Sequence, residues 1–195
     1  MYLVRETIPF IGAVLALVLI VELTYDEPDV TPTEIVLEEI VVPKLEPRKI
    51  IDYNQVECMA LNIYHEARNE SVEGQIAVGN VTLNRVLDSK FPNTICDVVY
   101  QAKLSSWWKK EHDREVPVKH QCQFSWYCDG KSDRIREERA YAKIKKLSYD
   151  IIDGRYDDNT YGSTYYHAHY VSPKWAKSFV KVAMIENHIF YVSNR

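Results

Sequence analysis

Glu66, in the segment from Asn62 to Glu70, is the side chain of this sequence best suited to chemistry. The residues before it repeat apolar side chains at helical spacing, which predicts a helix with one apolar face. These residues are Val56, Met59, Ala60, Ile63 and Ala67. Glu66 stands beside this face, where partial loss of solvent raises the pKa of a carboxyl group. A carboxylic acid that keeps its proton near neutral pH can protonate a glycosidic oxygen, so we predict that Glu66 is a general acid/base.

Two other interpretations of the same segment compete with this one. His65-Glu66 begins like the zinc-peptidase motif H-E-x-x-H, but Asn69 stands where the second histidine is required. Alternatively, Glu66 is a solvated acid paired with a neighbouring base.

His167 and His169 alternate as they would on a strand, and no third metal ligand follows at motif spacing. We therefore predict no metal site and no cofactor.

The elements that position Glu66 are mainly helical. Asn54 followed by Glu57 resembles a capping box at the start of the first helix. Further helices are predicted from Ser71 to about Leu87, from Thr94 to Tyr100 and over residues 133–153, with an irregular charged segment over residues 103–120. Ser172-Pro173 is typical of a helix start. The last residues alternate in polarity and predict a hairpin that turns at Glu186-Asn187. The fold class is therefore α+β, mainly helical, with a small C-terminal β-hairpin.

The N-terminal residues are predicted to be a targeting segment. Residues 8–21 are a run without charge, shorter than the roughly 17–25 residues of a membrane-spanning helix and typical of a signal-peptide core. No small-x-small cleavage site follows, which favours an uncleaved anchor over a removed signal. We expect residues 1–25 to be a signal anchor or signal peptide, with residues 8–23 holding an exported, periplasmic or cell-envelope protein at the inner membrane.

A proline-containing acidic linker is predicted over residues 26–51, and one domain over residues 52–195. Residues 22–48 carry eight acidic residues against two basic ones, and prolines at positions 28, 32, 43 and 47 disfavour regular structure. The rest of the chain is close to charge balance, which excludes the basic footprint of a nucleic-acid-binding protein. We expect a monomer without nucleic-acid partners.

The cysteine count agrees with export. The four cysteines have wide spacings without a C-x-x-C pair, which is typical of two disulfides in an exported chain. Three connectivities exist, and we favour Cys58–Cys96, which ties the first helix to a later one, with Cys122–Cys128, which closes a small loop. A zinc site or four free thiols are the alternatives.

Several motifs in register resemble the spore-cortex-lytic type of cell wall hydrolase over residues 53–193. The first runs Cys58-x3-Asn62-Ile63-Tyr64-x-Glu66-Ala67-Arg68-x-Glu70, and Asn84-Arg85-Val86 and Gln123-Phe124-Ser125 follow in order. The tail adds Tyr166-His167-Ala168, Pro173-x-Trp175-Ala176 and Asn187-His188-x-Phe190-Tyr191. Asn69 and Glu186 depart from the pattern where glycine is expected, and His65 replaces a more usual aromatic or small residue.

This resemblance implies a lysozyme-like domain that cleaves peptidoglycan between N-acetylmuramic acid and N-acetylglucosamine. It maps the general acid/base to Glu66. Many relatives are lytic transglycosylases, in which one carboxyl group suffices and the muramic 6-hydroxyl closes onto C1. Glu70 is predicted to raise the pKa of Glu66 by repulsion. If Glu70 or Glu73 were a nucleophile or a base for water, a hydrolysing muramidase would follow.

Substrate-binding residues follow from the chemistry of sugars, whose apolar faces are edged with hydroxyl groups. Gln123, Ser125, Tyr127, Tyr166 and His167 fit such a groove, and Trp107-Trp108 is either a lip over it or loop packing. Two further functions remain open: a peptidoglycan-binding protein that has lost catalysis, and a cysteine or zinc peptidase acting on the stem peptide. The presence of Glu66 opposes the first, and the even cysteine count and the missing histidine oppose the second.

Overall fold

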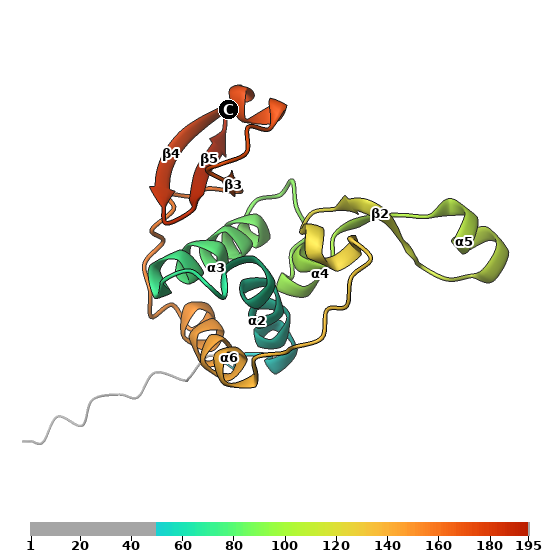
Figure 1. The fold of residues 1–195 in the computed structure, drawn as a ribbon, viewed down its shortest axis with the longest axis horizontal. Coiled ribbons are helices and arrows are strands. Elements are labelled where there is room, and N and C mark those ends of the chain that lie inside the picture. Colours follow the sequence, from blue (N-terminus) through green and yellow to red (C-terminus); the bar gives the residue numbers. More distant parts are fainter. Residues whose placement is uncertain (1–49, 195) are drawn as a thin grey trace, which may run out of the picture. The chain divides into compact units, whose positions relative to one another are not determined.

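A computed structural model describes residues 50–194 of the chain as a mainly helical α+β unit (Figure 1). The predicted anchor and nearly all of the predicted linker lie outside the described residues. The helices are α2 (Tyr53–Ala67), α3 (Val72–Leu87), α4 (Ile95–Val99), α5 (Ser106–His112) and α6 (Glu138–Ile152), with 3-10 turns η1 (Ser125–Cys128) and η2 (Lys174–Ser178). The strands are β1 (Ala102–Leu104), β2 (Pro117–Cys122), β3 (Tyr165–Ala168), β4 (Phe179–Ile185) and β5 (His188–Ser193).

Helices α2, α3 and α6 enclose the main core. The apolar face predicted for α2 is buried, and Met59 and Ile63 are fully inaccessible to solvent. Ile144 and Ile151 of α6 complete this core from the other side. Because the burial of such a side chain contributes about 1.5–3 kcal/mol, the packing of these faces holds α2 in place. The C-terminal turn of α2, which carries Glu66, is thereby fixed.

Local sequence signals were sufficient to predict the starts of some helices and not of others. Ser71 and Thr94, at which these two helices were predicted to start, cap α3 and α4, each accepting a backbone N–H with its hydroxyl. For α2 the predicted cap is wrong, because Asp52 accepts the Asn54 N–H at 2.8 Å. Ser172-Pro173 precedes only a 3-10 turn, in which Pro173 is the cap residue.

Helix α6 begins at Glu138, later than predicted. The backbone N–H groups of Arg136 and Glu137 donate to the Tyr64 hydroxyl at 3.1 and 3.2 Å. Because Tyr64 belongs to α2, these two backbone N–H groups are engaged in a tertiary contact rather than in a helix. A local sequence pattern cannot reveal such a contact. The buried Tyr64 phenol ties the chain before α6 to the helix that carries Glu66.

The C-terminal strands form a three-stranded antiparallel sheet in the order β3-β5-β4, rather than a hairpin alone. The hairpin of β4 and β5 turns at Glu186-Asn187 as predicted. Glu186 has a φ of 48°, which is the left-handed conformation that the expected glycine would adopt more easily. Strand β3 pairs with β5, placing Tyr166 opposite Phe190. This pairing brings Tyr166 to the helical layer.

Residues 103–120 are more regular than predicted. Strands β1 and β2 pair as an antiparallel ribbon with α5 at its far end (Figure 1). Trp107 packs edge-on against Trp108 and His112, Trp108 packs at a tilt against His112, and Trp107 remains 56% exposed. The two tryptophans were predicted to be either a lip over the substrate groove or loop packing, and the contacts observed are packing within their own segment.

The two favoured disulfides, Cys58–Cys96 and Cys122–Cys128, are both present. The first joins α2 to α4, and the second joins the end of β2 to the end of η1. Within residues 50–194, no helix combines the length and the apolar character needed to cross a membrane.

Candidate active site

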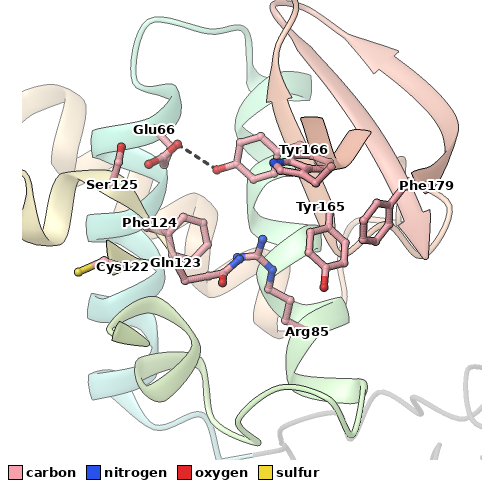
Figure 2. A pocket seen from close by; sticks show the side chains of 10 residues that line it. Glu66, Arg85, Cys122, Gln123, Phe124, Ser125, Tyr165, Tyr166 and Phe179 are labelled. Carbon is pink, nitrogen blue, oxygen red and sulfur yellow. Dashed lines mark hydrogen bonds between the residues drawn. The ribbon is translucent and has the colours of Figure 1, made fainter. Parts of the chain in front are cut away.

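Glu66 opens into a pocket of about 510 Å³ between α2, α3, the η1 segment and the C-terminal sheet (Figure 2). The lining residues come from distant parts of the chain. They are Glu66, Arg85, Cys122, Gln123, Phe124, Ser125, Tyr165, Tyr166, Trp175 and Phe179. Glu66 is the one carboxylic acid in this described lining. The pocket therefore presents a single acid to whatever it binds.

The immediate partner of Glu66 is Tyr166. Its hydroxyl donates to Oε2 of Glu66 at 3.1 Å, and Figure 2 shows the two side chains pointing toward each other. Burial raises the pKa of Glu66, while the Tyr166 hydrogen bond and the Arg85 charge oppose the rise. Burial, together with the negative charge of Glu66 when it is ionised, raises the pKa of Tyr166 well above its usual value, so the phenol stays a donor. Glu66 is thus a carboxyl group biased toward the protonated state, with one fixed hydrogen bond.

Arg85 lies beneath this pair and is only 3% exposed. Its Nε donates to the Thr164 carbonyl at 2.8 Å, immediately before β3. The guanidinium stacks over the Phe124 ring at 4.8 Å, and Figure 2 shows it between Phe124 and Tyr165. Burial lowers the pKa of Arg85, and the nearby Tyr166, Tyr165 and Glu66 raise it.

One rim of the pocket, Gln123-Phe124-Ser125, is held against α2 by a buried hydrogen-bond chain. The Trp126 indole donates to Oδ1 of Asn62 at 3.0 Å, and the Asn62 amide donates to the Thr82 hydroxyl at 3.2 Å. The Trp126 ring also stacks on His65 with 4.6 Å between ring centroids. Asn62 is fully buried and its amide group is hydrogen-bonded at both the oxygen and the nitrogen, so it sets the position of the rim relative to Glu66.

The opposite rim is aromatic. Tyr165, Trp175 and Phe179 pack together with centroid distances of 4.4 to 5.8 Å and face the pocket. Aromatic faces beside amide and hydroxyl groups suit a sugar, which is apolar on its ring faces and polar at its edges.

Four of the predicted site residues meet in this pocket: Glu66, Gln123, Ser125 and Tyr166. Glu70 does not line it, because its carboxylate accepts hydrogen bonds from the Asn187 side chain at 2.9 Å and from the Asn187 backbone N–H. The pKa of Glu66 is raised by burial, and the predicted repulsion by Glu70 is not among its causes.

Tyr127 and His167 also lie elsewhere. Tyr127 packs against Tyr100 at 4.8 Å at the edge of the core. His167 contacts the Tyr191 hydroxyl through Nε2 at 2.9 Å, and its ring packs edge-on against Trp175. Neither side chain lines the pocket that contains Glu66.

The pocket residues that sequence reasoning missed are Arg85, Phe124, Tyr165, Trp175 and Phe179, of which Phe124 stands in the matched motif Gln123-Phe124-Ser125. Arg85 and Trp175 stand inside the matched motifs Asn84-Arg85-Val86 and Pro173-x-Trp175-Ala176, which was the available signal. Nothing in the sequence marked Tyr165 or Phe179. Within residues 50–194, no group of three or more histidine, cysteine or acidic side chains is placed to hold a metal ion.

The fold and pocket together define a class: a small helical domain that presents one half-buried carboxylic acid in an aromatic and amide-lined cleft. The Cell Wall Hydrolase family profile matches residues 69–191. The chain therefore belongs to the cell wall hydrolase family. Glu66 lies just before the matched range, so its assignment depends on the geometry above.

Curated relatives are spore cortex-lytic enzymes. That of Bacillus cereus is 28% identical over 137 residues, which cover 70% of this chain and 44% of the relative. That of Halalkalibacterium halodurans is 27% identical over 138 residues, covering 70% of this chain and 34% of the relative. The chain thus spans less than half the length of these relatives.

Two solved structures are similar to this fold. The catalytic domain of the Bacillus cereus SleB protein aligns with a TM-score of 0.53 and 28% identity, covering 74% of this chain and 94% of that structure. The catalytic domain of the germination-specific lytic transglycosylase SleB from Bacillus anthracis aligns with a TM-score of 0.52 and 26% identity, covering 75% and 100%.

Proposed function

We propose that this protein is a lytic transglycosylase that cleaves the glycan strand of peptidoglycan between N-acetylmuramic acid and N-acetylglucosamine, with Glu66 as general acid/base. The observation that carries the proposal is the single half-buried carboxyl group in the pocket, with its pKa raised by burial and its orientation held by Tyr166. Family membership and the similarity to a lytic transglycosylase catalytic domain support the substrate class.

In the proposed reaction the Glu66 proton passes to the bridging oxygen as its bond to muramic C1 breaks, releasing N-acetylglucosamine with a free 4-hydroxyl. The muramic 6-hydroxyl then attacks C1, and Glu66, now a carboxylate, takes the proton of that hydroxyl. The product is a 1,6-anhydro ring, Glu66 is protonated again, and no water is consumed. One carboxyl group therefore performs both proton transfers.

A hydrolysing muramidase is the alternative, and it needs a second carboxyl group about 5–9.5 Å from the first. Glu70 is engaged with Asn187, and Glu73 is a solvent-exposed residue in the first turn of α3. Neither lines the pocket. The absence of a second acid from this described lining favours the intramolecular route.

The two disulfides support an extracytoplasmic location, since such bonds persist in oxidising compartments. Anchoring through residues 8–23 remains part of the proposal, as do action in the cell envelope and a monomeric state.

The test is digestion of purified sacculi by the wild type, by Glu66→Gln and by Glu73→Gln as a matched control, with products identified by mass spectrometry. We expect 1,6-anhydro-muropeptides from the wild type and the control, and a loss of at least about 100-fold for Glu66→Gln. Reducing muramic ends would establish the hydrolase instead. Cut stem peptides would indicate a peptidase, and full activity of Glu66→Gln would refute the assignment.

A further inference from the structure

Arg85 is a buried cation, and no ion pair described within residues 50–194 supplies a negative charge to balance it. None of the ion pairs described within residues 50–194 includes it, and its Nη1 is enclosed without a hydrogen-bond partner there. Its one described hydrogen bond goes to the neutral Thr164 carbonyl. Burial of an uncompensated charge is strongly unfavourable, and a guanidinium does not relieve this by losing its proton. A cation kept in such a place implies an anion that is present for part of the working cycle.

We propose that Arg85 is a positioning residue of the reaction, which stabilises the carboxylate that Glu66 becomes after it has protonated the leaving oxygen. This inference rests on the proposed function. The cation acts through space on Glu66 and does not touch the reacting sugar. Because the favourable interaction grows as negative charge develops, it lowers the free energy of the transition state more than that of the ground state.

The charged and titratable groups around Glu66 leave Arg85 as the cation for this role. Strand β3 contributes Tyr165 and Tyr166, whose phenol side chains are not cations, and α3 contributes Arg85. On α2 itself, His65 is stacked on Trp126. From β5, His188 packs edge-on against the Tyr166 ring at 5.1 Å and is not among the residues that line the pocket. The rim residues Gln123 and Ser125 carry no charge.

A direct substrate contact is the competing role for Arg85, and its enclosure opposes that role. The side chain is 3% exposed, its Nε is committed to Thr164, and aromatic rings of Phe124 and Phe91 flank the guanidinium at 4.8 and 5.5 Å. Arg85 contributes to the wall of the pocket, but Nη1 itself is enclosed, so a substrate oxygen would have to displace surrounding groups to reach it. The Glu66 carboxylate needs no such displacement, since its field acts across the buried space between them.

The experiment compares Arg85→Lys and Arg85→Gln with Arg139→Gln, which removes an exposed arginine of α6. The first measurement is the titration of the Glu66 carboxyl carbon by NMR without substrate, with the signal assigned by its loss in Glu66→Gln. In Arg85→Gln the midpoint should move to higher pH, whereas in Arg85→Lys and Arg139→Gln it should stay near that of the wild type.

The second measurement is kcat and KM on sacculi across pH. Arg85→Gln should lower kcat by about 10- to 100-fold, with the basic limb of the profile at higher pH, and Arg85→Lys should recover most of the loss. An unchanged Glu66 midpoint in Arg85→Gln would overturn the proposal. A rise in KM at constant kcat would also overturn it, because that result indicates a role in substrate binding. An equal loss of kcat in Arg85→Gln and Arg85→Lys, with the basic limb of the pH profile unmoved, would overturn it as well, because that result would indicate that only the hydrogen bond to Thr164 matters.

A third variant protects the test against misfolding. If Arg85→Gln does not fold, Arg85→Met takes its place, because it also removes the charge and fills the buried space with an unbranched apolar side chain. Its Glu66 midpoint should likewise move to higher pH, and an unchanged midpoint would overturn the proposal. Activity that survives in Glu66→Gln would refute the proposed function, while the substrate-free titration would still report whether Arg85 acts on Glu66.

Discussion

Replacement of Tyr166 by phenylalanine isolates the hydrogen bond to Glu66. The ring packs against Phe190 with 5.6 Å between centroids and against His188 at 5.1 Å, and phenylalanine preserves both contacts. Only the hydroxyl that donates to Oε2 at 3.1 Å is lost. A hydrogen bond to a charged group contributes about 1.5–3 kcal/mol. Because the bond strengthens as Glu66 becomes a carboxylate, kcat should fall by about 10- to 150-fold.

The pH dependence of the same variant has a definite sign. The Tyr166 hydrogen bond lowers the pKa of Glu66 against the larger effect of burial, so its removal raises that pKa further. Glu66 must be protonated to act as the acid, and the basic limb of the kcat profile should therefore move to higher pH.

The assay is the initial rate of anhydro-muropeptide release from sacculi at a series of pH values. Tyr170→Phe, at an exposed tyrosine that follows β3, is the control. A kcat of Tyr166→Phe within twofold of the wild type, with an unmoved basic limb, would refute the idea that this bond orients and stabilises the catalytic carboxyl group.

Two further predictions concern stability. Loss of the Cys58–Cys96 bond, which closes a 38-residue separation, should lower the free energy of unfolding by about 4 kcal/mol, and loss of Cys122–Cys128, which closes 6, by about 2 kcal/mol. Urea unfolding of paired serine variants measures both, and an inverted order would contradict the loop-entropy reasoning. The raised pKa of Glu66 means that the folded protein loses stability as pH rises from the unfolded value through the folded one. Glu66→Gln should therefore raise the melting temperature at pH 8 more than at pH 4, and an equal gain at both would show that deprotonation of Glu66 does not limit stability.

Helix positions and the disulfide partners were accessible from the sequence because their signals are local or few. The apolar face of α2 and the Ser71 and Thr94 caps depend on residues within a turn or two of one another. The start of α6 was predicted too early because the backbone N–H groups of Arg136 and Glu137, just before the helix, donate to the hydroxyl of Tyr64, which is far away in the chain. The ribbon of β1 and β2 was missed because its strands are short and mostly exposed, and β2 lacks the alternation of apolar and polar residues that predicts a strand.

For the candidate site, too, local features were predictable from the sequence and contacts between distant residues were not. The sequence by itself determined the family resemblance and the choice of Glu66, because a carboxyl group beside an apolar helical face is a local pattern. Only the tertiary structure decided what surrounds that group. It paired Glu66 with Tyr166, which is 100 residues away, buried Arg85 beneath them and directed Glu70 to Asn187. Hydrogen bonds and desolvation depend on distance in space, and the pairing of β3 with β5 helps to set that distance between Tyr166 and the Glu66 carboxyl group.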